Sequence, residues 1–339
     1  MFPNDVQRPV TPTDIGLLLI DGFALMSYAS FIEPFRAANS LAGRPLYTWK
    51  HIAQSGPEAV ASNGARIGAD GQVGDPLDCD MLFVFAAGDP AAFRDQACFA
   101  WLRSLARRGI GLGGVSGGPY LLARAGLLNR HRATIHWEHA AALQTEFPDL
   151  DLVSALYVID GDRMTCAGGT AGLDLALSLI ERERGPSLAN QVSEWFIRGE
   201  PRNPDLSQRS GMAARFGTTN RRLLSMLSAM DATLEEPLPR EALADKAGVS
   251  LRQLERLCVS QIGASITETY LAIRLDRAAE LLRSTGFSIT EIGIMCGFRN
   301  AAHFSRRLKD RFGKSPSLLR ADGALTSMLP ASRRHVKMP

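Results

Sequence analysis

The sequence lacks any apolar run close to the roughly 20 residues that a membrane-spanning helix requires. It begins with Met-Phe-Pro-Asn-Asp, which has neither the basic start nor the apolar stretch of a secretory signal peptide. Both absences argue against membrane insertion and export. We therefore expect a cytoplasmic protein with no membrane among its partners.

Cysteine is also sparse. The five cysteines of the 339-residue chain are scattered and never occur in a Cys-x-x-Cys spacing, which argues against both a zinc cluster and a disulfide framework. We expect all five to be small buried apolar residues in a reducing compartment, and we expect neither a metal nor a cofactor. They are Cys79, Cys98, Cys166, Cys258 and Cys296.

The net charge of +3 conceals an uneven distribution along the chain. Residues 1–200 carry 16 basic and 22 acidic side chains, a net of −6, whereas residues 201–339 carry 22 and 13, a net of +9. This asymmetry indicates that only the second part of the chain meets a polyanion. The length favours two domains, because single cores stop growing beyond about 250–300 residues.

Continuous apolar runs in the first half predict strands of a parallel sheet that is buried on both faces. The runs lie at residues 15–20, 81–86 and 110–115, and amphipathic helices are expected between them at residues 24–38 and 89–108. This alternation indicates a doubly wound, flavodoxin-like α/β domain.

The end of the first half has a different pattern. Apolar residues 156–159 and 163–167 flank Asp-Gly-Asp, which is typical of a hairpin turn, and helices are expected at residues 171–184 and 187–197. Pro and Gly breakers with little apolar periodicity then indicate a linker, and the pattern beyond it is wholly helical. The expected organisation is a first domain at residues 12–198, a linker at 199–219, a second domain at 220–322 and a flexible tail at 323–339.

The second domain contains the same short unit twice. Residues around Gly248 recur around Gly297 at an offset of 49, and residues around Gly263 recur around Gly313 at an offset of 50. Each unit predicts a short helix, a glycine turn and a second helix with an apolar seam, which is the helix-turn-helix arrangement. A helix over residues 266–283 is expected to link the units rigidly. Such a link would let the two units enter successive major grooves, which lie about 34 Å apart on one face of DNA.

The outer face of each second helix is basic and suits DNA. Arginine can bond guanine through two hydrogen bonds, asparagine or glutamine can do so with adenine, and lysine suits phosphates. One basic helix could equally be a solvated surface, but two at a repeat spacing favour double-stranded DNA. The candidates are Ser250, Arg252, Gln253 and Arg256 in the first unit and Arg299, Asn300, His303, Arg306, Arg307, Lys309, Arg311 and Lys314 in the second.

Five sequence runs in this domain carry a family resemblance. They lie at residues 270–278, 288–293, 296–298, 303–306 and 312–316. Through them residues 242–320 resemble the DNA-binding domain of the AraC/XylS family. The chain departs from the family at Cys258, where Phe is usual, and at Ile266, where Pro is usual. Both replacements are apolar, so DNA binding is expected to persist.

A possible catalytic motif lies in the first domain. The pattern Gly-x-Ser-x-Gly at residues 114–118 follows an expected strand and opens a helix, as in the nucleophile elbow of α/β-hydrolases. Those enzymes need an acid and then a histidine after the serine. Residues 117–135 contain no Asp or Glu, and His139 directly follows Glu138, so a triad cannot easily be assembled and no catalytic residue is expected.

The elbow belongs to a second set of family runs. They lie at residues 33–39, 113–117, 121–128, 134–138 and 168–174. Through them residues 14–198 resemble the class I glutamine amidotransferase-like, PfpI-type domain that GlxA-type regulators join to an AraC-type domain. Enzymes of that superfamily carry a cysteine at the elbow, and PfpI-type peptidases a histidine after it. Ser116 and Gly117 occupy these positions here, so the resemblance implies a ligand-sensing domain and not an enzyme.

Residues around the elbow are candidates for the ligand site. Backbone N–H groups at Gly117 and the helix start favour an anion such as a carboxylate, which Ser116 can also hydrogen-bond. Glu33 and Trp137 are candidate negative and aromatic walls for a quaternary or charged nitrogen, with His136 beside them. The alternatives stay open that Glu33 is a solvated acid, Trp137 a core aromatic and His136 a packing residue.

Residues 43–47 and 221–224 are similar to those of activators of glycine betaine, carnitine and arginine catabolism. The resemblance implies a ligand-responsive activator with a quaternary-amine or amino-acid-like effector, RNA polymerase as a partner and a homodimer as the assembly. Two alternatives remain. One is an amidase or hydrolase with a regulatory DNA-binding domain, and the other a scaffold that only dimerises, for example through residues 187–197.

Overall fold

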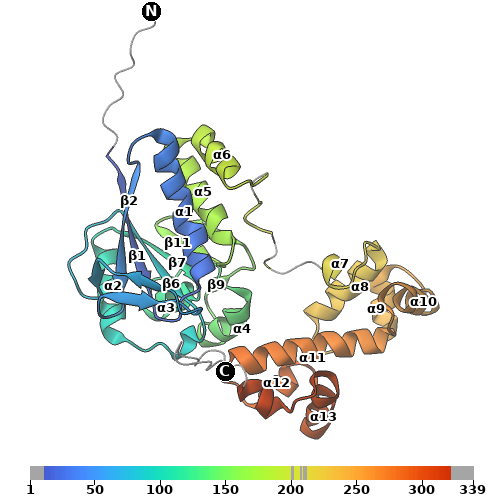
Figure 1. Cartoon of the computed structure of the whole chain (residues 1–339). Coiled ribbons are helices and arrows are strands. Elements are labelled where there is room, and N and C mark those ends of the chain that lie inside the picture. The colour runs from blue at the N-terminus through green and yellow to red at the C-terminus, as the bar shows by residue number, and fades with distance from the viewer. Residues whose placement is uncertain (1–10, 200–201, 207, 209–211, 322–339) are drawn as a thin grey trace, which may run out of the picture. The chain divides into compact units, whose positions relative to one another are not determined.

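The computed structural model describes residues 11–199, 202–206, 208 and 212–321. The chain divides into two compact units, one extending to Gln208 and the other beginning at Arg209 (Figure 1). The tail expected at residues 323–339 lies outside the described residues. Within those described, no helix combines the length and the apolar character needed to span a bilayer.

A seven-stranded sheet forms the centre of the first unit. Its strands are β1 (Thr13–Leu19), β2 (Tyr47–Ala53), β5 (Gly71–Gln72), β6 (Met81–Ala86), β7 (Gly111–Ser116), β10 (Tyr157–Asp160) and β11 (Arg163–Cys166). They follow the order β10-β11-β7-β6-β1-β2-β5, and neighbours are parallel except β10 and β11. This order confirms the doubly wound, flavodoxin-like fold.

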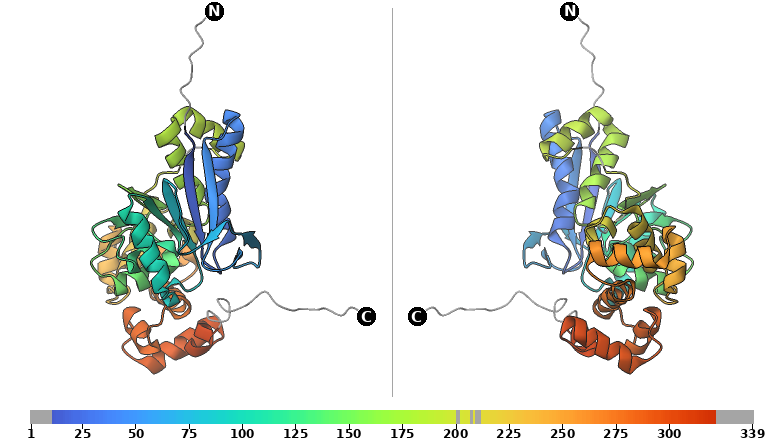
Figure 2. Two further views of the ribbon diagram at one scale, coloured as in Figure 1. Left: turned by 90° about the vertical axis from the view of Figure 1, so that its left-hand side faces the viewer. Right: turned by 90° about the vertical axis from the view of Figure 1, so that its right-hand side faces the viewer.

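Helices cover both faces of the sheet (Figures 1 and 2). Consecutive residues of β1 point to opposite faces, so Leu17 and Leu19 join one hydrophobic core and Leu18 joins the other. The first core is covered by α1 (Leu25–Ala42), α5 (Ala171–Arg184) and α6 (Pro186–Trp195), and the second by α2 (Gln96–Arg107), α3 (Gly118–Arg124) and α4 (Trp137–Glu146).

The prediction of a single helix over residues 89–108 is wrong. Pro90–Ala92 forms a short 3-10 turn, and α2 begins only at Gln96. Asp95 fixes this start, because its side chain accepts hydrogen bonds from two backbone N–H groups of the first turn. An apolar period extends across such a break and therefore does not reveal it.

The hairpin expected near residue 161 is confirmed, with Asp160 opposite Arg163. Because β11 also pairs in parallel with β7, the hairpin extends the central sheet. Four further strands form two small sheets that the sequence did not predict, since two or three residues leave no visible period. They are β3 (Glu58–Val60), β4 (Arg66–Gly68), β8 (Arg132–Ala133) and β9 (Asp151–Leu152).

The segment expected as a linker is partly fixed to the first unit. The Leu156 N–H donates to the carbonyl of Pro204 at 2.7 Å. Nε2 of Gln208 donates to Thr134 Oγ1 at 3.0 Å and to the carbonyls of Ile135 and Ala155, both at 2.8 Å. Described residues of this segment therefore make specific hydrogen bonds to the first unit.

The described part of the second unit contains helices and no strand, as expected. A first core is built around Leu223, Leu243 and Leu254, and Ile292 and Phe304 are fully buried further along. The helices are α7 (Met212–Arg215), α8 (Arg221–Ala232), α9 (Arg240–Ala247), α10 (Leu251–Ile262), α11 (Ile266–Ser284), α12 (Ile289–Met295) and α13 (Ala301–Phe312).

Glycine forms the turn of each helix-turn-helix unit. Gly248 and Gly297 have φ angles of 66° and 75°, a left-handed conformation that glycine adopts without steric cost. Arg274 of α11 holds the second turn, because its guanidinium donates to the carbonyls of Cys296 at 2.7 Å and Gly297 at 2.6 Å. The same group lies 4.3 Å from the ring centroid of Phe298. Helix α11 thus directly fixes the position of the second helix-turn-helix.

Candidate DNA-binding surface and effector site

The second helix of each unit exposes the arginines that the sequence predicted to face DNA. Arg252 and Arg256 are exposed on α10, and Arg306 is exposed on α13. On the opposite sides of these helices, Leu254 and Phe304 are fully buried. Each helix is therefore anchored by its apolar side and presents its basic side to solvent, which is the arrangement that a major-groove helix requires.

Three predicted base-reading residues hold the starts of these helices. Ser250 Oγ accepts the N–H of Gln253, and the Gln253 side chain accepts the N–H of Ser250, which together form a capping box. Asn300 Oδ1 accepts the N–H of His303 at 3.0 Å. Pairing with adenine requires the amide oxygen as well as the NH2 group. Gln253 and Asn300 therefore cap their helices in this structure. Because an amide oxygen has a second lone pair, their role as adenine readers stays a prediction.

The remaining residues predicted to contact DNA differ in their exposure to solvent and in their pairing. Arg311 forms two hydrogen bonds of 2.8 and 2.9 Å with Asp276 of α11, so part of its donor set is already used. Arg307 is only half-buried on α13 and keeps part of its surface in solvent. The remaining candidates are exposed: Arg299, His303, Lys309 and Lys314.

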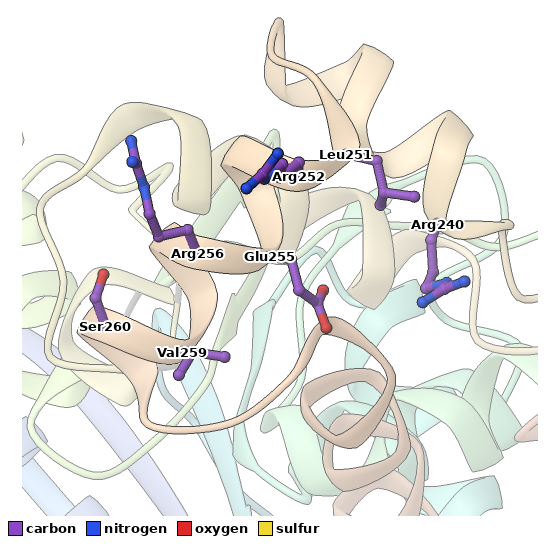
Figure 3. Close-up of a pocket in the computed structure, with 7 residues that line it drawn as sticks. All are labelled: Arg240, Leu251, Arg252, Glu255, Arg256, Val259 and Ser260. Atoms are coloured by element: carbon purple, nitrogen blue, oxygen red, sulfur yellow. The ribbon is translucent and has the colours of Figure 1, made fainter.

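An open groove of about 780 Å³ runs along the outer face of α10 (Figure 3). Only Arg252 and Arg256 of its residues were predicted from the sequence; the others include Arg240 at the start of α9 and Val259, which is 55% exposed. Val259 lies three residues after Arg256, so helical spacing could have placed it on the arginine face. Its apolar surface suits a thymine methyl group. The groove is lined by Arg240, Leu251, Arg252, Glu255, Arg256, Val259 and Ser260.

Ser116 forms the elbow between β7 and α3, as the sequence predicted. Its φ of 61° lies in the left-handed region, where a residue other than glycine is strained by about 1–3 kcal/mol. Only 6% of the residue is exposed. A side chain at Gly168 would come within 2.7 Å of Ser116 Cβ, so the chain after β11 packs directly against the elbow.

Ser27 is a neighbour of the elbow that the sequence analysis missed. This residue is 3% exposed, and its Oγ accepts the N–H of Gly169 at 2.8 Å. The same Oγ lies 2.8 Å from the position that a side chain at Gly168 would occupy. Its place in the first turns of the helix after β1 could have indicated this, because such residues lie at the carboxyl edge of the sheet.

The start of α3 offers fewer donors than the sequence predicted. The Gly117 N–H already donates to the carbonyl of Ala86 at 2.7 Å. The Tyr120 N–H donates to the carbonyl of Gly117 at 3.1 Å. Pro119 has no N–H. Three of the four positions from 117 to 120 therefore cannot bind an anion, which corrects the expected carboxylate cradle.

The surroundings of Glu33 differ from those expected of a pocket wall. Glu33 pairs with Arg36 at 2.6 Å and keeps 43% of its side chain exposed. Six residues separate it from Ser27, about 240° around the helix at roughly 100° per residue, so the two point to different faces. Trp137 is half-buried, and its backbone N–H donates to Oε1 of Gln208 at 2.7 Å. The structure thus supports the solvated-acid alternative for Glu33.

Two histidines lie beside the elbow at the start of α4. The backbone N–H of His136 donates to the carbonyl of Ser116 at 3.2 Å, and its Nδ1 accepts the N–H of Glu138 at 3.4 Å. Burial lowers the pKa of His136, and burial together with His136 lowers the pKa of His139 to about 3. Both imidazoles are therefore neutral at pH 7.

Comparison with known proteins agrees with both halves of this structure. Residues 15–182 match the DJ-1/PfpI family, and residues 243–322 match a helix-turn-helix domain. A DJ-1/PfpI-type α/β unit joined to two exposed basic helices defines a DNA-binding transcription regulator.

Relatives that align with most of the chain narrow this class. The HTH-type transcriptional regulator GlxA of Rhizobium meliloti is 43% identical over 94% of this chain and 96% of its own length. The HTH-type transcriptional regulator CdhR of Pseudomonas aeruginosa is 41% identical over 91% of each chain, and GbdR of the same species is 39% identical over 90% of this chain and 83% of its own. The chain belongs to this family of AraC-type transcriptional regulators, which confirms the resemblance found in the sequence. These relatives are named as regulators and not as enzymes.

Proposed function

We propose that the first unit senses a small metabolite beside Ser116 and that this regulator activates genes for the catabolism of a quaternary amine or amino-acid-like compound. The strained φ of Ser116 carries the proposal, because non-glycine residues in this conformation cluster at functional sites. Ser116 also lies at the carboxyl edge of the sheet, where doubly wound folds bind their ligands. The resemblance to regulators of betaine, carnitine and arginine catabolism supports the class of effector.

We further propose that Ser116 binds and does not catalyse. Among the described residues no hydrogen bond joins Ser116 Oγ to an imidazole, and Nδ1 of His136 is occupied by its helix-capping bond. A serine without a paired base remains a weak nucleophile. The strained elbow is a feature that hydrolases share, but the described residues supply no base for Ser116, so binding is the function that the site supports better.

The proposed active form is a cytoplasmic homodimer that contacts RNA polymerase. In α6, Val192 is fully buried, whereas Trp195 at its end is 50% exposed and the following Ile197 is 97% exposed. Large apolar side chains left in solvent support contact with a second chain. Closed twofold dimers are the commonest assembly of soluble proteins.

Gln208 gives this sensor a route to the second unit. It is the last residue before the second unit begins, and its side chain bonds the Thr134 hydroxyl, the Ile135 carbonyl and the Trp137 N–H next to the elbow. A ligand that moves this backbone would change how the chain leaves the first unit. If the ligand binds more tightly to one of the two resulting conformations of the chain, it shifts the fraction of the protein that binds DNA.

A thermal-shift screen of betaine, carnitine, dimethylglycine, choline and arginine tests the proposal. A ligand present at 100 times its Kd should stabilise the protein by about 2.7 kcal/mol. We expect the ligand to lose this stabilising effect in Ser116→Ala and to keep it in the control Ser104→Ala on α2. Gln208→Ala should keep the thermal shift but lose the effect of the ligand on DNA affinity. DNA binding that no compound alters, with no thermal shift, would contradict the sensor function.

A further inference from the structure

Three side chains with metal-ligand chemistry lie together at the start of α4. One ligand atom from each of His136, Glu138 and His139 lies within 4.8 Å of the other two. Nδ1 of His136 is 3.9 Å from Oε2 of Glu138, and the two imidazole centroids are 5.8 Å apart. If Nδ1 keeps its 3.4 Å helix-capping bond, Nε2 is the His136 nitrogen that binds the ion. Tetrahedral zinc bonds of about 2.0–2.1 Å place ligand atoms about 3.3–3.4 Å apart. Small side-chain rotations would therefore bring the three atoms around one ion.

We propose that His136, Glu138 and His139 bind a divalent transition-metal ion such as Zn2+. Two imidazole nitrogens and one carboxylate oxygen form the donor set of zinc sites that have three protein ligands. Such a set leaves a coordination position for water or for a ligand. Imidazole also suits copper and nickel, so the donors define a class of ions more than a single metal.

The burial of the three residues fits such a site. His139 is 4% exposed, so its ring is held by packing. The side chains of His136 and Glu138 are 30% and 44% exposed, which leaves a path for an ion from solvent. The partial positive charge of the helix start opposes a cation, but the full negative charge of the Glu138 carboxylate counters it.

The site adjoins the elbow through the hydrogen bond from the His136 N–H to the carbonyl of Ser116. A bound ion would supply the positive charge that the start of α3 offers only weakly. Its open position suits a carboxylate or an amine. The inference revises the expectation of no metal, and it does not depend on the identity of the proposed effector.

Metal titration of the full-length, untagged protein, first stripped with a chelator, tests the site. Calorimetry with Zn2+ is expected to show one ion per chain, and Co2+ in its place is expected to give the visible absorption of a four-coordinate ion. His136→Asn keeps a capping side chain at the start of α4 but removes the imidazole. Glu138→Gln changes a partly exposed side chain and removes the charge. Each variant should weaken Zn2+ binding at least tenfold.

His131→Asn is the matched control, since His131 pairs with Asp160 outside the cluster. It should bind Zn2+ like the unmodified protein. Circular dichroism of each variant establishes that the fold is kept, and Glu138→Gln tests the site even if His136→Asn unfolds. Absence of stoichiometric binding, or unchanged affinity in Glu138→Gln, overturns the proposal.

Discussion

Replacing Asp174 with alanine is expected to destabilise the first unit by about 3–5 kcal/mol, because it removes one side of a buried ion pair. Asp174 is 5% exposed, and its two carboxylate oxygens bind Arg198 and Arg202. The side chain of Arg198 is itself only 14% exposed. Without the carboxylate, two guanidinium groups lie together with no compensating charge. The segment that leads to Gln208 should loosen at the same time.

Denaturant unfolding followed by tryptophan fluorescence measures this effect. The signal reports the first unit, since all four tryptophans of the chain precede residue 209. Asp205→Ala is the control on the same segment. Asp205 pairs with Arg132 at 3.6 Å with both side chains more than half exposed, so its loss should cost less than about 1 kcal/mol. Equal effects of the two replacements would show that the Asp174 pair is no stronger than a surface contact.

Replacing Arg252 or Arg306 with alanine is expected to weaken binding to specific DNA by about 1–3 kcal/mol each if it reads a base. That range corresponds to roughly 5- to 150-fold in Kd. Both side chains are exposed on the outer faces of α10 and α13. The losses should add in the double variant, since the two helices belong to separate helix-turn-helix units.

Fluorescence anisotropy with a duplex selected by the protein from a random pool measures the affinity. Arg107→Ala is a matched control. It removes the same charge, but from an exposed arginine at the end of α2 in the first unit. Its affinity should remain close to that of the unmodified protein. If Arg252→Ala and Arg306→Ala also retain full affinity, these helices do not read DNA.

The helix-turn-helix units could be predicted because several local signals agree in them. Gly248 and Gly297 are required by the turns, and Leu254 and Phe304 mark the buried sides of the second helices. The parallel sheet was predictable for a similar reason, since strands buried on both faces are continuously apolar. These features depend on periodicity and on backbone conformation, which are local properties of a sequence.

Features that depend on polar partners could not be predicted in the same way. Asn300 has the chemistry of an adenine reader, but its position just before α13 makes it a helix cap. Glu33 could be placed on a helix, yet its pairing with Arg36 decides where its charge points. Ser27 reaches the elbow only because the chain after β11 packs against both. These outcomes depend on residues far apart in the sequence or on a choice between two local partners.

The entry of both α10 and α13 into major grooves of one duplex is tested most directly by methylation interference on a selected duplex. The 19 residues of α11 span about 28 Å at roughly 1.5 Å per residue, close to the separation of about 34 Å between successive major grooves. We predict two patches of interfering guanines about 10 base pairs apart on one face of the DNA. A single patch, or two patches on opposite faces, would contradict binding by both helices.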